Sequence, residues 1–127
     1  MITLVRYSVP VRQMIKEAID ALDGKATNKQ ISKWVHEKYR DDNVKEGTIM
    51  DHIQVCTVNR KSRVNWPENN KSRICNDERY DFLYSTESAV VESYDKEKHG
   101  EWILVKRGGK ATALSLEEAI FDFEHLK

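Results

Sequence analysis

The spacing of apolar residues changes near residue 79, and this change limits the folds open to the chain more than any other feature. Before it, apolar residues recur every three or four positions, the period of an amphipathic helix. After it, they gather in short, aromatic-rich runs typical of strands. The pattern predicts helices over 9–23, 28–39 and 48–60, followed by an antiparallel hairpin over about 79–94. We therefore expect an α+β domain.

The first two helices carry the clearest local signals. Gly24 is a natural stop for the first helix, and Thr27 with Gln30 has the spacing of a capping box at the start of the second. The apolar stripes of the three helices are expected to meet in one core. Its predicted members are Ile15, Ile19, Leu22, Ile31, Trp34, Val35, Ile49 and Ile53.

The stretch 47–63 combines an apolar stripe with a polar face and a basic exit. Thr48 is placed as the N-cap, Cys56 falls on the apolar side, and three cations lie within residues 59–63. Such a helix is typical of the recognition helix of a helix-turn-helix domain. An ordinary core helix with a solvated basic end explains the same residues, and this stretch alone does not separate the two.

The region after the third helix begins with a long polar segment at 61–78, which is expected to be a loop. Tyr80, Phe82 and Tyr84 are then predicted on one face of the first strand of the hairpin. They either pack on the helices, which is the commoner case, or form a platform on which bases stack.

A third strand is predicted at 101–105, and Ser115 with Glu118 has the spacing of a second capping box that opens a short final helix. We expect one domain over 1–127. Its core would span 8–105, with a C-terminal helical extension at 111–127.

The 127 residues carry a formal net charge of zero, but the charge is unevenly distributed. Residues 1–73 hold 14 Lys and Arg against 9 Asp and Glu, a balance of +5, whereas residues 74–127 hold 7 against 12, a balance of −5. Within the first part, the segment 57–73 has five cations and one acid. A local patch of this kind is what a phosphate backbone would meet.

The composition indicates neither a membrane protein nor a disulfide-stabilised one. No apolar run approaches the roughly 18 residues of a membrane span, and the N-terminus lacks the features of a signal peptide. Cys56 and Cys75 are too few for a disulfide framework, and Cys56 is expected to be a buried free thiol. A reducing, cytoplasmic location is expected.

Three helices followed by a hairpin is the order of a winged helix-turn-helix. The chain resembles the winged helix-turn-helix domains of the HARE type, which accompany prokaryotic restriction systems and some eukaryotic chromatin proteins. It is more closely similar to a little-characterised domain often fused to restriction-type modules. The resemblance covers about residues 8–105. It rests on residues 15–22, 27–31, 47–49, 57–63 and 81–84 and on Trp102, of which 57–63 and 81–84 are the most specific. It implies duplex DNA binding, with a sensitivity to modified bases, and supplies no catalytic residue.

The sequence offers no recognisable catalytic or metal site. A restriction-type nuclease has Glu or Asp two residues before a Lys, and the one such triplet, at 23–25, is better explained as a helix end. The four histidines have no helical spacing, and neither cysteine has a CxxC partner. The two glycines at 108–109 match no phosphate loop. We expect no enzyme activity, no metal and no cofactor.

The sequence therefore favours a winged helix that binds double-stranded DNA. Thr48, Gln54 and Asn59 are candidate readers of base edges, because Gln and Asn pair bidentately with adenine. The candidate phosphate contacts are Arg60, Lys61, Arg63, Lys71 and Arg73. Trp66 either stacks on nucleic acid or holds its loop in place. The acidic second half is expected to face away from the duplex.

The alternative is a winged helix that binds protein and not nucleic acid. Val55 and Val58 lie on the mixed face of the third helix, where they would dock a partner protein or a second copy of the chain. DNA binding predicts a steep dependence of affinity on salt, whereas an apolar protein interface does not.

Overall fold

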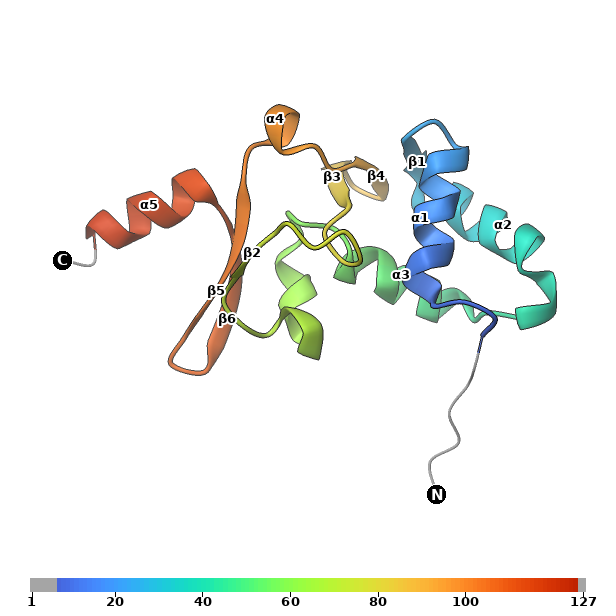
Figure 1. Ribbon diagram of the computed structural model, residues 1–127, viewed down its shortest axis with the longest axis horizontal. Helices are drawn as coiled ribbons and strands as arrows, with labels where there is room; N and C mark the ends of the chain where they lie inside the picture. The colour runs from blue at the N-terminus through green and yellow to red at the C-terminus, as the bar shows by residue number, and fades with distance from the viewer. Residues whose placement is uncertain (1–6, 126–127) are drawn as a thin grey trace, which may run out of the picture.

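Two small antiparallel sheets separate the N-terminal helices from the C-terminal helix (Figure 1). The computed structural model describes residues 7–125. Within them the chain is a mixed α+β protein with five α-helices and two three-stranded sheets, so the predicted α+β class is confirmed. The α-helices are α1 (Val11–Ala21), α2 (Asn28–Lys38), α3 (Glu46–Val55), α4 (Lys96–His99) and α5 (Leu116–His125).

The first sheet has the strand order β1-β4-β3, and the second has the order β2-β5-β6. The strands of the first sheet are β1 (Lys25–Thr27), β3 (Leu83–Glu87) and β4 (Val90–Ser93). Those of the second are β2 (Arg73–Ile74), β5 (Trp102–Arg107) and β6 (Lys110–Ser115). Three short 3₁₀ helices complete the described chain: η1 (Arg40–Asp42), η2 (Lys61–Asn65) and η3 (Pro67–Asn69).

The predicted signals at the ends of the helices are present. The Thr27 Oγ1 accepts from the backbone N–H of Gln30 at 3.1 Å, and the Gln30 side chain accepts from the Thr27 N–H at 2.8 Å. Ser115 and Glu118 exchange the same two bonds at the start of α5, each at 3.1 Å. Gly24, at φ +84°, closes α1 by donating its N–H to the Ile19 carbonyl oxygen at 2.8 Å.

The third helix differs from its prediction at both ends. It begins at Glu46 with Lys45 in the N-cap position, so the placement of Thr48 as the cap is wrong. It ends at Val55 and not near residue 60, because the chain leaves the helix to pair with β3. The Val58 N–H donates to the Leu83 carbonyl oxygen at 2.9 Å, and the Leu83 N–H donates to that of Cys56 at 3.0 Å.

The hairpin also begins later than the aromatic pattern predicts. The Tyr80 and Asp81 N–H groups both donate to the Asp77 carbonyl oxygen, which forms a turn, and strand β3 starts only at Leu83. Tyr80, Phe82 and Tyr84 therefore do not share a strand face, and the base-stacking platform is wrong. Phe82 is buried in the helical core instead.

The second sheet agrees with the sequence pattern in only one of its strands. Its β5 is the predicted third strand, displaced by about two residues at its end, whereas β2 and β6 occupy segments expected to be loop and helical extension. The C-terminal extension at 111–127 is wrong in its first part, because Ala111 and Ala113 alternate with outward residues and pair along β5. Residues 1–6 and 126–127 of the expected domain lie outside the described residues.

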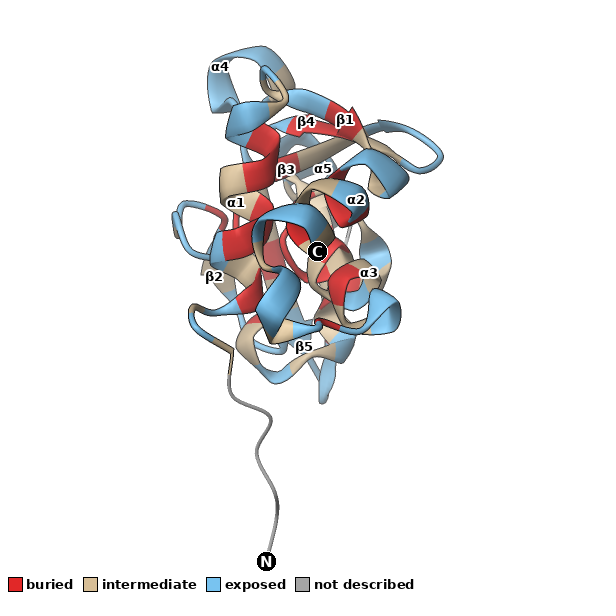
Figure 2. Cartoon of the chain, turned by 90° about the vertical axis from the view of Figure 1, so that its right-hand side faces the viewer, coloured by how far each residue is buried: buried red, intermediate tan, exposed pale blue. Residues whose placement is uncertain are grey.

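Buried side chains form two clusters. The larger unites α1, α2 and α3 with the first sheet, and buried bands run along all three helices (Figure 2). Of its predicted members, six are buried, and Leu22 and Trp34 are half-buried against them. The smaller cluster contains Val58, Cys75, Leu104 and Ala113 and lies under the second sheet. None of the described helices has the length and apolar character needed to cross a membrane.

Candidate nucleic-acid interface

Arg63, an expected phosphate contact, is instead the largest fully buried side chain among the described residues. Its guanidinium donates to the Val55 carbonyl oxygen from Nε at 3.1 Å and from Nη2 at 2.9 Å. Nη2 also lies 2.7 Å from Oδ1 of Asp81, which is equally enclosed. A buried charge is tolerated only with such partners. The assignment of Arg63 to phosphate is therefore wrong.

Arg73 belongs to the same buried cluster. Its guanidinium donates to both carboxylate oxygens of Asp81 and, at 2.8 Å, to Oδ1 of Asn69. The Asn69 Nδ2 in turn donates to the carbonyl oxygens of Val55 and Arg63. We call Arg63, Asn69, Arg73 and Asp81 the arginine–aspartate cluster. It joins the end of α3 to β2, and its bonds leave Arg73 unavailable for phosphate.

Asn59, an expected base reader, fixes the chain to β3. Its Nδ2 donates to the Ser85 carbonyl oxygen and its Oδ1 accepts from the Ser85 N–H, both at 2.8 Å. Because both ends of the amide are engaged, the assignment of Asn59 as a reader of bases is wrong.

Gln54 and Thr48 remain partly exposed on α3. Gln54 accepts from the Ser62 hydroxyl at 2.6 Å through Oε1, and its Nε2 has no hydrogen-bond partner among the described residues. The same helix exposes the carboxylates of Glu46 and Asp51. The helix can thus donate to one base edge and accept from another, but its outer surface is not basic.

The other expected phosphate contacts differ in whether their charged groups already have a partner within the protein. Arg60 is half-exposed, and Lys71 is exposed; neither forms an ion pair with a described residue. Lys61 is exposed but already engaged, since its Nζ donates to the Ala113 carbonyl oxygen and lies 3.8 Å from Oε2 of Glu118. Of the five expected phosphate contacts, Arg60 and Lys71 are the two with free charge.

Trp66 holds its loop in place. The ring is half-buried and packs against the larger cluster, at the junction between η2 and η3. Trp66 therefore packs against the protein and fixes its loop, the second of the two roles that the sequence allows.

A group of cations that sequence reasoning missed lies at the turn of the β5–β6 hairpin. Lys106, Arg107 and Lys110 are all exposed there. The Lys106 N–H donates to the Ser72 hydroxyl at 2.8 Å, which brings Lys71 alongside. The acidic part of the chain, residues 74–127, therefore contains a group of cations at this turn. One of them, Lys106, lies next to the basic segment 57–73. Only the pairing of β2 with β5 reveals this, because Lys71 and Lys106 are far apart in sequence.

The described side chains show no metal site and no activated thiol. No group of three His, Cys, Asp or Glu side chains among those described, at residues 7–121, is arranged to hold a metal ion. Burial raises the pKa of the Cys56 thiol to about 12 and that of Cys75 to about 11, so both remain protonated.

Comparison with known proteins yields one match. The sequence model of a family described as a domain of unknown function, DUF7669, matches residues 10–91. The match takes in α1 to α3, the arginine–aspartate cluster and β3, and it ends within β4. Neither the curated proteins nor the solved structures gave a significant match. Because the matched segment covers well over half of the chain, the protein belongs to the DUF7669 family.

Proposed function

We propose that this protein is a winged helix-turn-helix domain that binds double-stranded DNA. The observation that carries the proposal is the order of the first sheet. Strand β1, between α1 and α2, pairs with β4, the second strand of the hairpin that follows α3. Helices α1 to α3 with a sheet of order β1-β4-β3 are the arrangement expected of a winged helix. In it, α3 is the recognition helix and β3–β4 the wing.

The proposed DNA contacts are made by the side chains of the expected interface that are still accessible to a ligand. Arg60 and Lys71 contact phosphates and fix the register, while Thr48 and the free Nε2 of Gln54 lie on the reading helix. Asp51, exposed on the same helix, can accept from the N4 amine of cytosine. The resemblance to HARE-type domains extends the proposal to DNA of restriction systems and to modified bases.

The proposal is tested by titrating labelled duplexes of random sequence with the wild type and Arg60→Ala at two salt concentrations. Phosphate binding makes the affinity fall with rising salt, and loss of Arg60 flattens the salt slope by about one. Binding that is absent, or that does not respond to salt, would reject the proposal.

A protein-binding role is supported by other side chains than the expected ones. Val55 and Val58 are 1% and 0% exposed, so docking through these two valines is wrong. Ile74 and Ile120, by contrast, are 61% and 52% exposed. These two apolar side chains are the observation behind a docking alternative. Retention of a protein partner at high salt, combined with the absence of DNA binding, would favour it.

A further inference from the structure

We propose that the turn of the β5–β6 hairpin is a second DNA-contacting arm, which grips phosphates beside α3. The arm consists of Lys71, Lys106, Arg107 and Lys110, and three of the four lie outside the segment that matches the family. This inference rests on the proposed function and adds a binding site to it.

The tip of the arm is open. Arg107 and Lys110 face each other across the turn formed by Gly108 and Gly109, whose φ angles are +55° and +81°. A Cβ atom added at either glycine would meet no atom within 4 Å, so no described residue packs over the turn. The side chains at this end are therefore accessible to a ligand as large as a duplex.

The charge of the arm is not neutralised by any described side chain. None of its four cations forms an ion pair with a described residue, whereas Lys61, Arg63 and Arg73 all lie next to a carboxylate. Like charges directly opposite each other in a sheet are destabilising. The Arg107–Lys110 pair thus does not stabilise the hairpin, and its positive charge remains available to an external polyanion.

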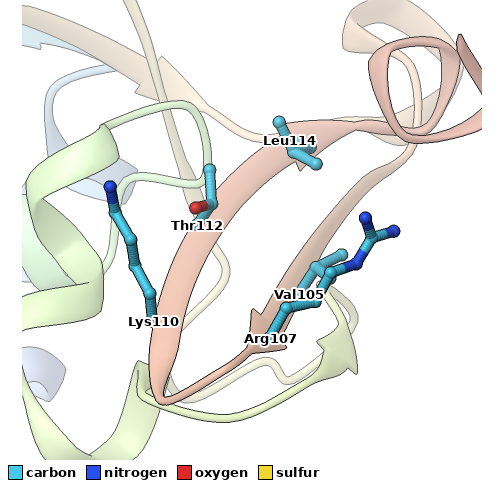
Figure 3. Close-up of a pocket in the computed structure, with 5 residues that line it drawn as sticks. All are labelled: Val105, Arg107, Lys110, Thr112 and Leu114. Carbon is cyan, nitrogen blue, oxygen red and sulfur yellow. The ribbon is translucent and has the colours of Figure 1, made fainter. Parts of the chain in front are cut away.

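The directions of the side chains favour an extended ligand over a small anion. Arg107 and Lys110 border the same shallow hollow on the outer face of the hairpin, but their side chains diverge from the turn (Figure 3). Charges that diverge cannot converge on one phosphate. They match the successive phosphates of a strand, where Arg can also bind bidentately.

The arm is also held beside the proposed recognition helix. Residues 61–65 form η2, which follows α3, and Lys61 of η2 donates to the Ala113 carbonyl oxygen of β6. The Ser62 hydroxyl donates to Gln54 of α3. Through these contacts the hairpin and α3 are fixed to the same segment, so a duplex that meets the exit of α3 also lies near the arm.

The test compares two double variants with the same loss of charge. K106Q/K110Q removes two of the four positive charges of the arm. The control, K25Q/K96Q, removes two exposed lysines of β1 and α4, which lie at the top of Figure 1, whereas the hairpin turn lies at the bottom. Neither control lysine forms an ion pair with a described residue. Each protein is titrated with random and preferred duplexes over a series of salt concentrations, after thermal melts have verified folding.

K106Q/K110Q is expected to flatten the slope of log affinity against log salt by about two and to weaken both duplexes alike. The control should leave the slope unchanged. If K106Q/K110Q keeps the wild-type salt slope, or if the control flattens it equally, the claim that the arm contacts DNA is wrong. The proposed function would then remain intact. Absence of salt-dependent binding by the wild type would reject both.

Discussion

Arg63 and Asp81 lie 18 residues apart in the chain and form an ion pair of 2.7 Å in which both side chains are 0% exposed. The pair joins the segments 57–63 and 81–84, on which the resemblance to HARE-type domains chiefly rests. They look like a basic DNA-binding exit and a strand, but one supplies the cation and the other the anion of a buried joint. Arg63 and Asp81 therefore have a structural role in the fold.

Replacing Arg63 should destabilise the protein far more than replacing its exposed neighbour. Arg63→Met leaves Asp81 buried with one partner fewer, and breaking a buried pair in this way costs about 3–5 kcal/mol. Arg60→Met should change the free energy of unfolding by less than about 0.5 kcal/mol. Urea unfolding of the two variants provides the comparison. Equal losses would show that the buried pair has no special role.

Ile53 and Ile74 provide a matched test of the core. Ile53 is 2% exposed in the helical cluster, and Ile53→Ala should lower the free energy of unfolding by roughly 2–5 kcal/mol. Ile74, at 61% exposure, should lose only a few tenths of a kcal/mol on the same change. Denaturant melts measure both. A small loss at Ile53 would place that face of α3 outside the core.

Asp77 should make stability depend on pH in the acid range. The side-chain hydrogen bond from Arg79 lowers the pKa of Asp77 from 3.8 to about 2. Since the folded-state pKa lies below the unfolded one, the contribution is present above about pH 4 and is lost as the pH falls towards 2. Asp77→Asn should be less stable than wild type at pH 6, and this difference should shrink as the pH falls. A constant difference would contradict the assignment.

Gln54 should affect sequence preference and leave the salt slope unchanged. If its free Nε2 contacts a base edge, Gln54→Ala should cost about 1–3 kcal/mol on the preferred duplex and little on random ones. Thr48→Ala, on the same helix, serves as a second probe. A uniform loss on all duplexes would assign Gln54 to positioning through its bond to Ser62.

The parts of the fold that could be predicted depend on contacts close in sequence. The capping boxes at Thr27 and Ser115 and the glycine stop at Gly24 are local, and the structure contains all three. The helical core followed from apolar spacing for the same reason. The winged helix and its DNA contacts stay predictions.

The predictions from sequence are wrong where segments far apart in the chain form hydrogen bonds with each other. Leu83 accepts a hydrogen bond from the Val58 N–H and donates its own N–H to the Cys56 carbonyl oxygen, and this pairing accompanies the early end of α3 and the late start of β3. Nothing near Arg63 in sequence indicates that it will be buried in an ion pair with Asp81. The pairing of β2 with β5, which brings Lys71 to Lys106, likewise depends on residues about 30 positions apart. Local patterns contain no information on such pairings.

The distribution of the two thiols gives the protein an internal reporter for each of its clusters. Cys56 lies in the helical cluster and Cys75 under the second sheet, and burial keeps both protonated. An alkylating reagent can therefore reach each sulfur only when the surrounding structure opens. The order in which the two cysteines are labelled would show whether the second sheet can detach while the three helices stay packed.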